Sequence, residues 1–241
     1  MRPSLRRLTA AAVIAIAPAS ASAATVTLSQ QTNVGAYWGI FGGNGHAAVS
    51  VTSASAPATT YNGVGGGFDL VGSDGIGAFT AFCIDLMQYL ILPASYITSA
   101  MPNTFPDSRV ATLERLFETG YKGLDLTNSA KSAGFQLAVW EIAFENDSAY
   151  NAYDINSGNF KSNLLGPGNA AAAFAQTLLN GLGGPVTQNY KFSFFLSGTT
   201  QDLVSVSAVP LPAAGLLLMA GLGGLAALRR KRKALAPLAV A

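Results

Sequence analysis

The chain contains a single cysteine, Cys83, and a single histidine, His46, among its 241 residues. One cysteine cannot form an intramolecular disulfide or a multi-cysteine zinc site. One histidine excludes a cluster of metal-binding histidines and leaves a Ser-His-Asp triad with one candidate base. His46 follows Asn44-Gly45, and no Gly-x-Ser-x-Gly motif is present, so we interpret it as a turn residue. We predict a protein that is not an enzyme and holds no metal or cofactor; a hydrolase with an unrecognised site is the least favoured alternative.

Charged side chains are also scarce, at 11% of the sequence. The chain has 14 basic and 12 acidic residues, but three basic residues lie in the first seven positions and five lie at 229–233. The segment Ala24–Ala208 therefore keeps six basic residues against all 12 acidic ones, a formal charge of −6. A thinly charged, acidic domain lacks the basic patch that nucleic acids require. We exclude nucleic acid as a partner.

The first 23 residues have the composition of an export signal. They contain three arginines, an apolar run and a small-x-small end: Arg2, Arg6, Arg7, Ala10–Ala17 and Ala21-Ser22-Ala23. This order is typical of a secretory signal peptide cleaved near Ala23–Ala24. An amphipathic first helix is the alternative. The signal predicts an exported protein.

The C-terminal residues have the composition of a second targeting signal. Val209-Pro210-Leu211-Pro212-Ala213 leads into an apolar stretch, which ends at the basic cluster Arg229-Arg230-Lys231-Arg232-Lys233. Leu211–Leu228 spans 18 residues, just long enough for a transmembrane helix, and the basic cluster keeps its own end in the cytoplasm. We therefore divide the chain into a signal peptide (1–23), an extracellular domain (24–208), a sorting signal (209–233) and a tail (234–241).

This C-terminal targeting signal resembles the PEP-CTERM sorting signal in its Val-Pro-Leu-Pro-Ala variant, here Val209–Ala213. The resemblance implies processing by an exosortase-type membrane protease in a Gram-negative bacterium that makes extracellular polysaccharide. It also implies a membrane-inserted precursor and a final place on the cell surface or in the extracellular matrix. The tail Ala234–Ala241 departs from the pattern, because such signals usually stop soon after the basic cluster.

The segment between the two targeting signals is predicted to form strands at both ends and helices in the middle. Predicted strands are Thr25–Gln31, Val34–Phe41, His46–Thr52, Ile76–Leu90, Tyr190–Leu196 and Leu203–Ser207. Predicted helices are one capped by Asp107 and ended by Gly120, one over Gly134–Asn146 that follows a cap at Thr127 or Asn128, and Ala170–Asn180. This order predicts an α+β, mainly β domain: a β-sandwich or barrel with a helical insertion.

Three glycine- or aspartate-rich stretches invite other interpretations. Gly42–Gly45 predicts a hairpin between the second and third strands. Gly63–Gly67 lacks the closing Lys-Ser/Thr of a phosphate-binding loop, so we interpret it as a turn between strands. Asp154–Gly158 resembles the start of a calcium loop, but its glycine comes one place early and no spaced glutamate closes it.

The predicted helix over Gly134–Asn146 has a glutamine, Gln136, on the side that is expected to be apolar. At about 100° per residue, Gln136 lies nearly opposite Glu145 and far from Glu141. We expect the two glutamates to mark the solvent-exposed side, which turns Gln136 into apolar surroundings. An unpartnered buried amide costs about 1–3 kcal/mol, so Gln136 needs a partner, and Cys83 is a candidate.

The residues around Cys83 and Gln136 resemble the bacterial thioester domain of surface adhesins. That family has an aromatic-Cys-aliphatic motif, matched by Phe82-Cys83-Ile84, and downstream a Gln-x-Ala-aliphatic-Trp motif, matched by Gln136-Leu137-Ala138-Val139-Trp140. Phe135 departs from the family, which commonly has threonine before the glutamine. The resemblance covers about 76–146 and implies a thioester between Cys83 and Gln136, with Ala138 as part of its supporting motif.

The implied chemistry assigns roles to neighbouring residues. Phe82 and Trp140 are candidates to shield the thioester from water, and Asp85, two residues beyond Cys83, is a candidate to deprotonate the thiol or orient the amide. A nucleophile on a surface or polysaccharide partner would then open the thioester. The alternative is a non-reactive structural protein of the exopolysaccharide matrix, in which Cys83 is a small buried hydrophobe.

Overall fold

The computed structural model describes residues 24–30, 40–54, 58–99, 105–145, 153–163, 169–183 and 189–208. The predicted signal peptide (1–23), sorting signal (209–233) and tail (234–241) lie outside these ranges. Within the ranges, no helix has the length and apolar content that crossing a bilayer requires.

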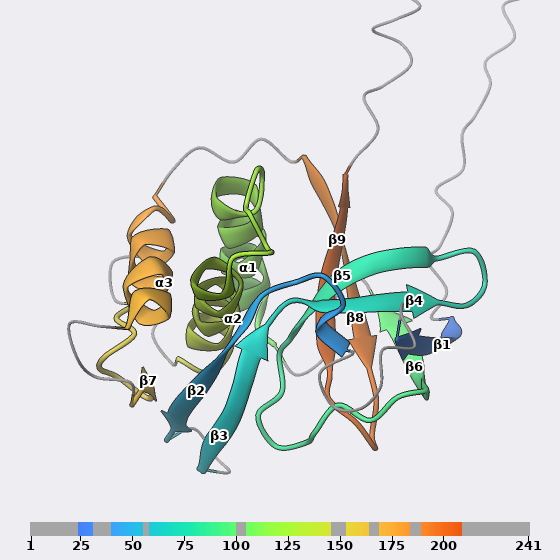
Figure 1. Cartoon of the computed structure of the whole chain (residues 1–241), viewed down its shortest axis with the longest axis horizontal. Coiled ribbons are helices and arrows are strands. Elements are labelled where there is room, and N and C mark those ends of the chain that lie inside the picture. The colour runs from blue at the N-terminus through green and yellow to red at the C-terminus, as the bar shows by residue number, and fades with distance from the viewer. Residues whose placement is uncertain are drawn as a thin grey trace, which may run out of the picture.

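Six antiparallel strands form a closed barrel in the order β1-β4-β5-β9-β8-β6 (Figure 1). They are β1 (Thr25–Gln30), β4 (Phe68–Gly72), β5 (Gly77–Cys83), β6 (Ala94–Ser99), β8 (Tyr190–Leu196) and β9 (Leu203–Ala208). Closure pairs the backbone groups of each strand with a neighbour on both sides over part of its length. The barrel confirms the prediction of a mainly β fold.

A second layer lies beside the barrel (Figure 1). It contains the helices α1 (Asp107–Gly120), α2 (Ser129–Phe144) and α3 (Ala170–Asn180), and a sheet of β3 (Thr59–Gly66), β2 (His46–Ser53) and β7 (Phe160–Ser162) in that order. In the chain, β2 and β3 fall between the barrel neighbours β1 and β4, whereas the helices and β7 fall between the neighbours β6 and β8. The layer is therefore built from two insertions into the barrel, which the pairing of β2 with β7 joins.

Short-range sequence signals set the helix boundaries. Asn128 caps α2, accepting a 3.1 Å hydrogen bond from the Lys131 N–H, and Asn169 caps α3 in the same way through the Ala172 N–H. Both caps confirm the predictions, as does the end of α3 at Gly181. Asp107 is the first residue of α1 rather than its cap, because Pro106 takes the cap position.

Two strand predictions need correction. Gly63–Gly67, predicted as a turn, is mostly the second half of β3. A Cβ on Gly65 would lie 3.2 Å from Val49 Cγ1 and 3.6 Å from Gln136 Cγ, so glycine lets β3 pass close to α2. The predicted strand Ile76–Leu90 is shorter: β5 ends at Cys83, which was expected in its middle.

The predicted hairpin at Gly42–Gly45 is also replaced by other pairing. In the described part of the chain, β2 pairs with β3 and β7. Residues 34–39 of its expected partner lie outside the described ranges, and the neighbouring Ile40 and Phe41 form a helical turn. Strands β4 and β6 had no predicted counterpart of their own, which left two walls of the barrel unassigned.

Helix α2 is the central element of the second layer. It packs against β2, β3, β5, β7, α1 and α3, so both Glu141 and Glu145 are buried, at 0% and 6% exposure. Segment 153–163 covers them: the Asp154 N–H donates to Glu141 Oε1 at 3.0 Å and the Asn159 N–H to Glu145 Oε2 at 2.8 Å. The prediction of a solvent-exposed glutamate face was wrong, because a distant segment supplies the donors that water was expected to supply.

Candidate functional site

Gln136 and Cys83 meet where α2 abuts the end of β5. Gln136 Oε1 accepts a 2.9 Å hydrogen bond from the Cys83 N–H, and Gln136 Nε2 donates a 2.8 Å hydrogen bond to the Cys83 carbonyl. Cys83 is fully buried, and Gln136 is 1% exposed. The buried amide thus has a partner 53 residues away in the chain, and that partner is the residue the sequence indicated.

Cys83 lies at the end of β5, which explains why its backbone N–H and carbonyl can bond to a side chain. Successive residues of a strand direct their amides to opposite neighbours. The Ile84 N–H donates to Asp202 on the β9 side, so the Cys83 groups face the side of β4. Pairing between β4 and β5 ends at Phe68 and Ala81. The Gln136 amide takes the place of the missing strand residue.

Ser132, one helical turn earlier on α2, also pairs with a backbone group at the end of a strand. Its Oγ accepts a 2.9 Å hydrogen bond from the Gly67 N–H, next to the start of β4, and the side chain is fully buried. Ser132 and Gln136 are four residues apart and therefore share a face of the helix. Together they close the gap that opens between β4 and β5. Ser132 was not predicted as a site residue, although a second polar residue at this spacing on an apolar helix was the signal.

The Cys83 thiol itself is turned toward the chain that follows it. Its Sγ donates to the Asp85 carbonyl at 2.7 Å and accepts from the Asp85 N–H at 3.2 Å. Burial raises the pKa of the thiol well above its ordinary value, against a smaller lowering by the hydrogen bond to Asp85 and by the Trp140 side chain. The Trp140 indole N–H lies near the sulfur, but no hydrogen bond of good geometry joins them. At neutral pH the thiol is protonated.

The three neighbours predicted for this site, Trp140, Phe82 and Ala138, lie at different places relative to the thiol. Trp140 is 1% exposed and lies beside the thiol, as expected of a shield. Phe82 does not cover the thiol: it points to the opposite face of β5 and packs against Phe117 and Phe135. Ala138 is buried in α2.

Asp85 also departs from its predicted role. It lies beyond the end of β5, and its carboxylate accepts hydrogen bonds from the Met87 N–H at 2.6 Å and from Gln88 Nε2 at 3.1 Å. The carboxylate therefore stabilises the turn that follows it. Only the backbone of Asp85 bonds to the thiol, because the strand on which the same-side argument depended has already ended.

Tyr96 is a further neighbour that the sequence did not indicate. It is 1% exposed, and burial raises the pKa of its hydroxyl to about 12, against a smaller lowering by Thr200 and with small increases from Cys83 and Asp202. Tyr96 lies on β6, which pairs with β1 and β8. It brings a buried, protonated phenol to the Cys83 side of the barrel.

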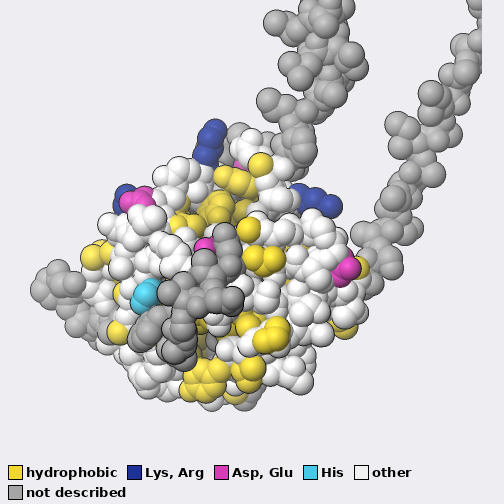
Figure 2. Space-filling model, turned by 45° about the vertical axis from the view of Figure 1, so that its right-hand side comes forward, with side chains coloured by type: hydrophobic (Ala, Val, Ile, Leu, Met, Phe, Trp, Pro, Cys, Tyr) yellow, Lys and Arg dark blue, Asp and Glu magenta, His cyan; other side chains and the backbone are white. Residues whose placement is uncertain are grey.

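Within the described ranges, no group of three or more His, Cys, Asp and Glu side chains is arranged to hold a metal ion. The Asp154 carboxylate is occupied by Asn156 and Ser157, which forms a local turn. His46 is the first residue of β2, and its ring stacks on Phe41 at a centroid distance of 4.5 Å. On the face shown in Figure 2, charged side chains are few.

No protein-family model matches the chain, and no curated protein matches it. Several solved structures are similar to it, among them the following two. The N-terminal domain of the Streptococcus pyogenes pilus tip adhesin Cpa has a TM-score of 0.39 and 19% identity, over 60% of this chain and 85% of that one. The N-terminal thioester domain of a surface protein from Clostridium perfringens has a TM-score of 0.40 and 13% identity, over 59% and 89%. The chain is coarsely similar to these domains, and the function proposed for it rests on its own contacts.

Proposed function

We propose that this protein is an exported surface domain in which Cys83 and Gln136 form an internal thioester that bonds to a partner. The observation that supports the proposal is the pair of hydrogen bonds, 2.9 and 2.8 Å long, that holds the Gln136 amide against Cys83 in a fully buried site. The cysteine is the only one in the chain. Export to the cell surface or matrix, with processing at Val209–Ala213 by an exosortase-type protease, belongs to the same proposal.

The proposed reaction needs one rotation and one proton transfer. Sγ turns away from the Asp85 carbonyl, loses its proton and attacks the Gln136 side-chain carbon. The C–N bond breaks, ammonia leaves with the thiol proton, and a Cys–Gln thioester remains. An oriented intramolecular pair of this kind reaches effective molarities of about 10⁵ M or more. That advantage offsets the high pKa of the buried thiol.

The thioester would act once rather than turn over. An amine or hydroxyl on a surface protein or polysaccharide attacks the Gln136 carbonyl, the Cys83 thiol leaves, and an amide or ester joins Gln136 to the partner. Trp140, buried beside the sulfur, excludes water until a partner approaches. The protein is thereby proposed as a covalent adhesin rather than an enzyme.

Intact mass of the purified protein tests the bond. We expect the mass to be lower than the sequence mass by one ammonia, and to return to the sequence mass, corrected for the substitution, in Cys83→Ala and in Gln136→Ala. Gln30→Ala, which removes a glutamine from β1, is the matched control and keeps the loss. Treatment with methylamine should add the amine to Gln136 and release one thiol. A full sequence mass with one thiol titratable after unfolding would refute the thioester.

The second candidate is a non-reactive structural protein of the exopolysaccharide matrix. It is favoured by a specific feature of the site: both hydrogen bonds of the Gln136 amide go to the Cys83 backbone, and the thiol bonds to Asp85 instead. In this reading Gln136 only closes the sheet. The same mass measurement separates the two candidates, since the second requires the full sequence mass.

A further inference from the structure

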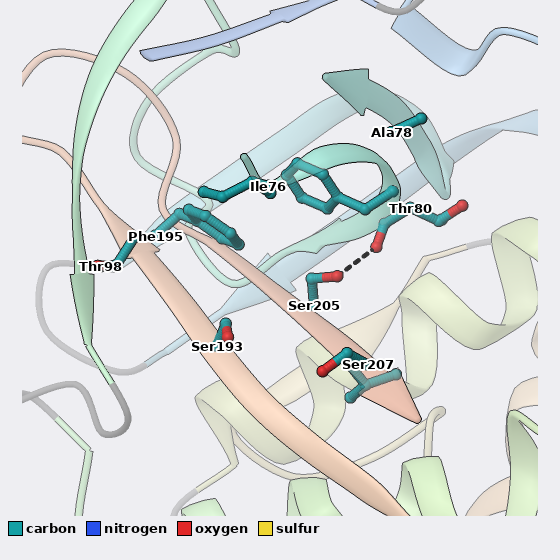
Figure 3. A pocket seen from close by; sticks show the side chains of 10 residues that line it. Ile76, Ala78, Thr80, Thr98, Ser193, Phe195, Ser205 and Ser207 are labelled. Carbon is teal, nitrogen blue, oxygen red and sulfur yellow. Dashed lines mark hydrogen bonds between the residues drawn. The ribbon is translucent and has the colours of Figure 1, made fainter. Parts of the chain in front are cut away.

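A cavity of about 590 Å³ lies along β5, β6, β8 and β9 (Figure 3). This volume is within the usual range of small-molecule sites. Its lining is Ile76, Ala78, Phe79, Thr80, Thr98, Ser193, Phe195, Ser205, Val206 and Ser207. None of these residues carries a charge.

The strand register explains why the barrel is hollow here. Cys83, Leu203 and Phe195 lie opposite one another on β5, β9 and β8, and we call these three residues the Cys83 row. One step along the same face lie Ala81, Ser205 and Ser193, the Ser205 row. The small side chains of Ser193 and Ser205 leave space beside Phe195, and all three residues line the cavity.

The cavity combines hydroxyl groups with an aromatic pair. Ser205 Oγ donates to the Thr80 carbonyl at 2.7 Å, and Figure 3 shows Ser193 and Ser207 around the same space. The hydroxyls of Ser193 and Ser207 have no hydrogen-bond partner among the described residues. Phe79 stacks on Phe195 with their ring centroids 5.1 Å apart. The site therefore offers unused hydroxyl groups beside an apolar ring surface.

These features select one class of ligand. A hydrocarbon would leave the hydroxyl of the half-buried Ser193 without a partner, and an unpaired polar group away from water is costly. A peptide added as a strand would need an unpaired edge, and the barrel is closed. Lys191 lies opposite Ser207 in the register, but it is exposed and is not part of the lining, so an anion has no paired charge within the cavity.

We infer that this cavity binds a neutral sugar residue. Each sugar hydroxyl both donates and accepts, as a serine hydroxyl does, and the C–H face of a pyranose ring suits the half-buried Phe79 ring. The site is separate from the Gln136 contact and does not depend on the thioester. A glycan-binding site would add reversible recognition to a domain whose other site is proposed to bond covalently.

Titration of the full chain with neutral disaccharides tests the inference. The protein is kept in a zwitterionic detergent without a sugar headgroup, and maltose, cellobiose and lactose are titrated by calorimetry beside cellobiouronic acid and decanol. We expect at least one neutral disaccharide to bind, more tightly than the acid and without competition from decanol. Failure of all three neutral sugars to bind, or a preference for the acid or for decanol, would overturn the inference.

Variants locate the binding. Ser193→Leu fills the cavity and should abolish binding, while the pair Ser193→Ala and Ser207→Ala should weaken it about tenfold through lost hydrogen bonds. Ser129→Ala, on the exposed first turn of α2, is the matched control and should bind normally, as should Cys83→Ala. Unchanged binding in a folded Ser193→Leu protein, or in the double alanine variant, would place the sugar elsewhere and refute the site. Normal sugar binding in Cys83→Ala separates this result from any failure of the thioester.

Discussion

The Cys83 row and the Ser205 row lie next to each other on one barrel wall, yet their surroundings differ. The Cys83 row is 0–3% exposed, and α2 seals its end with the Gln136 amide and the Trp140 ring. The Ser205 row ends in small hydroxyl side chains beside a cavity. One step along a strand therefore separates a row that ends at a buried amide, where unpaired polar groups are costly, from a row that borders a cavity. The difference at the Cys83 end comes from α2, which supplies the Gln136 amide.

The largest expected effect comes from removing the amide that seals the Cys83 row. Gln136→Leu keeps the bulk but leaves the Cys83 N–H and carbonyl unpaired in a buried site. We expect the free energy of unfolding to fall by about 2–6 kcal/mol, the cost of two such groups. Urea unfolding should be measured in the Cys83→Ala background, so that no thioester contributes. A loss below about 1 kcal/mol would mean that other groups replace the amide.

A pH titration tests the helix that covers the Cys83 row. Burial, followed by the charges of Glu145 and Asp154, raises the pKa of Glu141 to about 8 from an ordinary value of 4.5. The neutral form is therefore favoured on folding, so this stability is fully present below pH 4.5 and is lost as pH rises through about 8. Within this window we expect a loss of about 1.4 kcal/mol per pH unit.

Glu141→Gln is the variant that isolates this pH dependence. It keeps an oxygen to accept from the Asp154 N–H and cannot ionise. The slope of stability against pH, from thermal unfolding at several pH values, should flatten in this variant. An unchanged slope would assign the pH dependence to another group.

A smaller effect is expected where α2 meets α3. A Cβ on Gly134 would lie 2.6 Å from the Ala171 carbonyl oxygen, a backbone atom that cannot move alone. We expect Gly134→Ala to destabilise the protein by about 1–3 kcal/mol through overpacking, even though alanine is the better helix former. Chemical denaturation measures it. A gain in stability would show that α3 shifts freely and does not fix the cover of the Cys83 row.

The smallest effect is expected in the Ser205 row. Ser205→Ala removes one hydrogen bond, from Ser205 Oγ to the Thr80 carbonyl at 2.7 Å. Because the neighbouring cavity can supply water to the freed carbonyl, we expect a loss of only about 0.5–1.5 kcal/mol. A loss as large as that of Gln136→Leu, measured by the same urea unfolding, would remove the distinction between the two rows.

Much of the fold follows from short-range patterns. The caps Asn128 and Asn169, the end of α1 at Gly120 and the strand β8 all agree with their predictions. Gln136 is buried as predicted, but Glu141 and Glu145 are buried as well, so the periodicity that set them apart does not hold. The predicted glutamate face was wrong because segment 153–163, outside the helix, donates hydrogen bonds to both carboxylates.

The candidate site divides in the same way. A lone cysteine and an inward glutamine were visible as residues, and their proximity agrees with the resemblance that paired them. The role predicted for Asp85 depended on β5 continuing past Cys83, which it does not. Ser132 and Tyr96 were missed, since their partners belong to strands distant in the chain.

Cys83, Gln136 and the helix caps could be identified without a structure, because helix periodicity, capping and the count of cysteines are properties of neighbours or of composition. Their contacts could not, since these depend on how the chain folds. Gln136 meets the backbone of Cys83 rather than its thiol, since β4 stops pairing with β5 just before that point. The serines line a cavity because three strands bring small side chains to one step of the barrel. Such contacts join residues far apart in the chain, and the pairing of distant strands, not local preference, sets them.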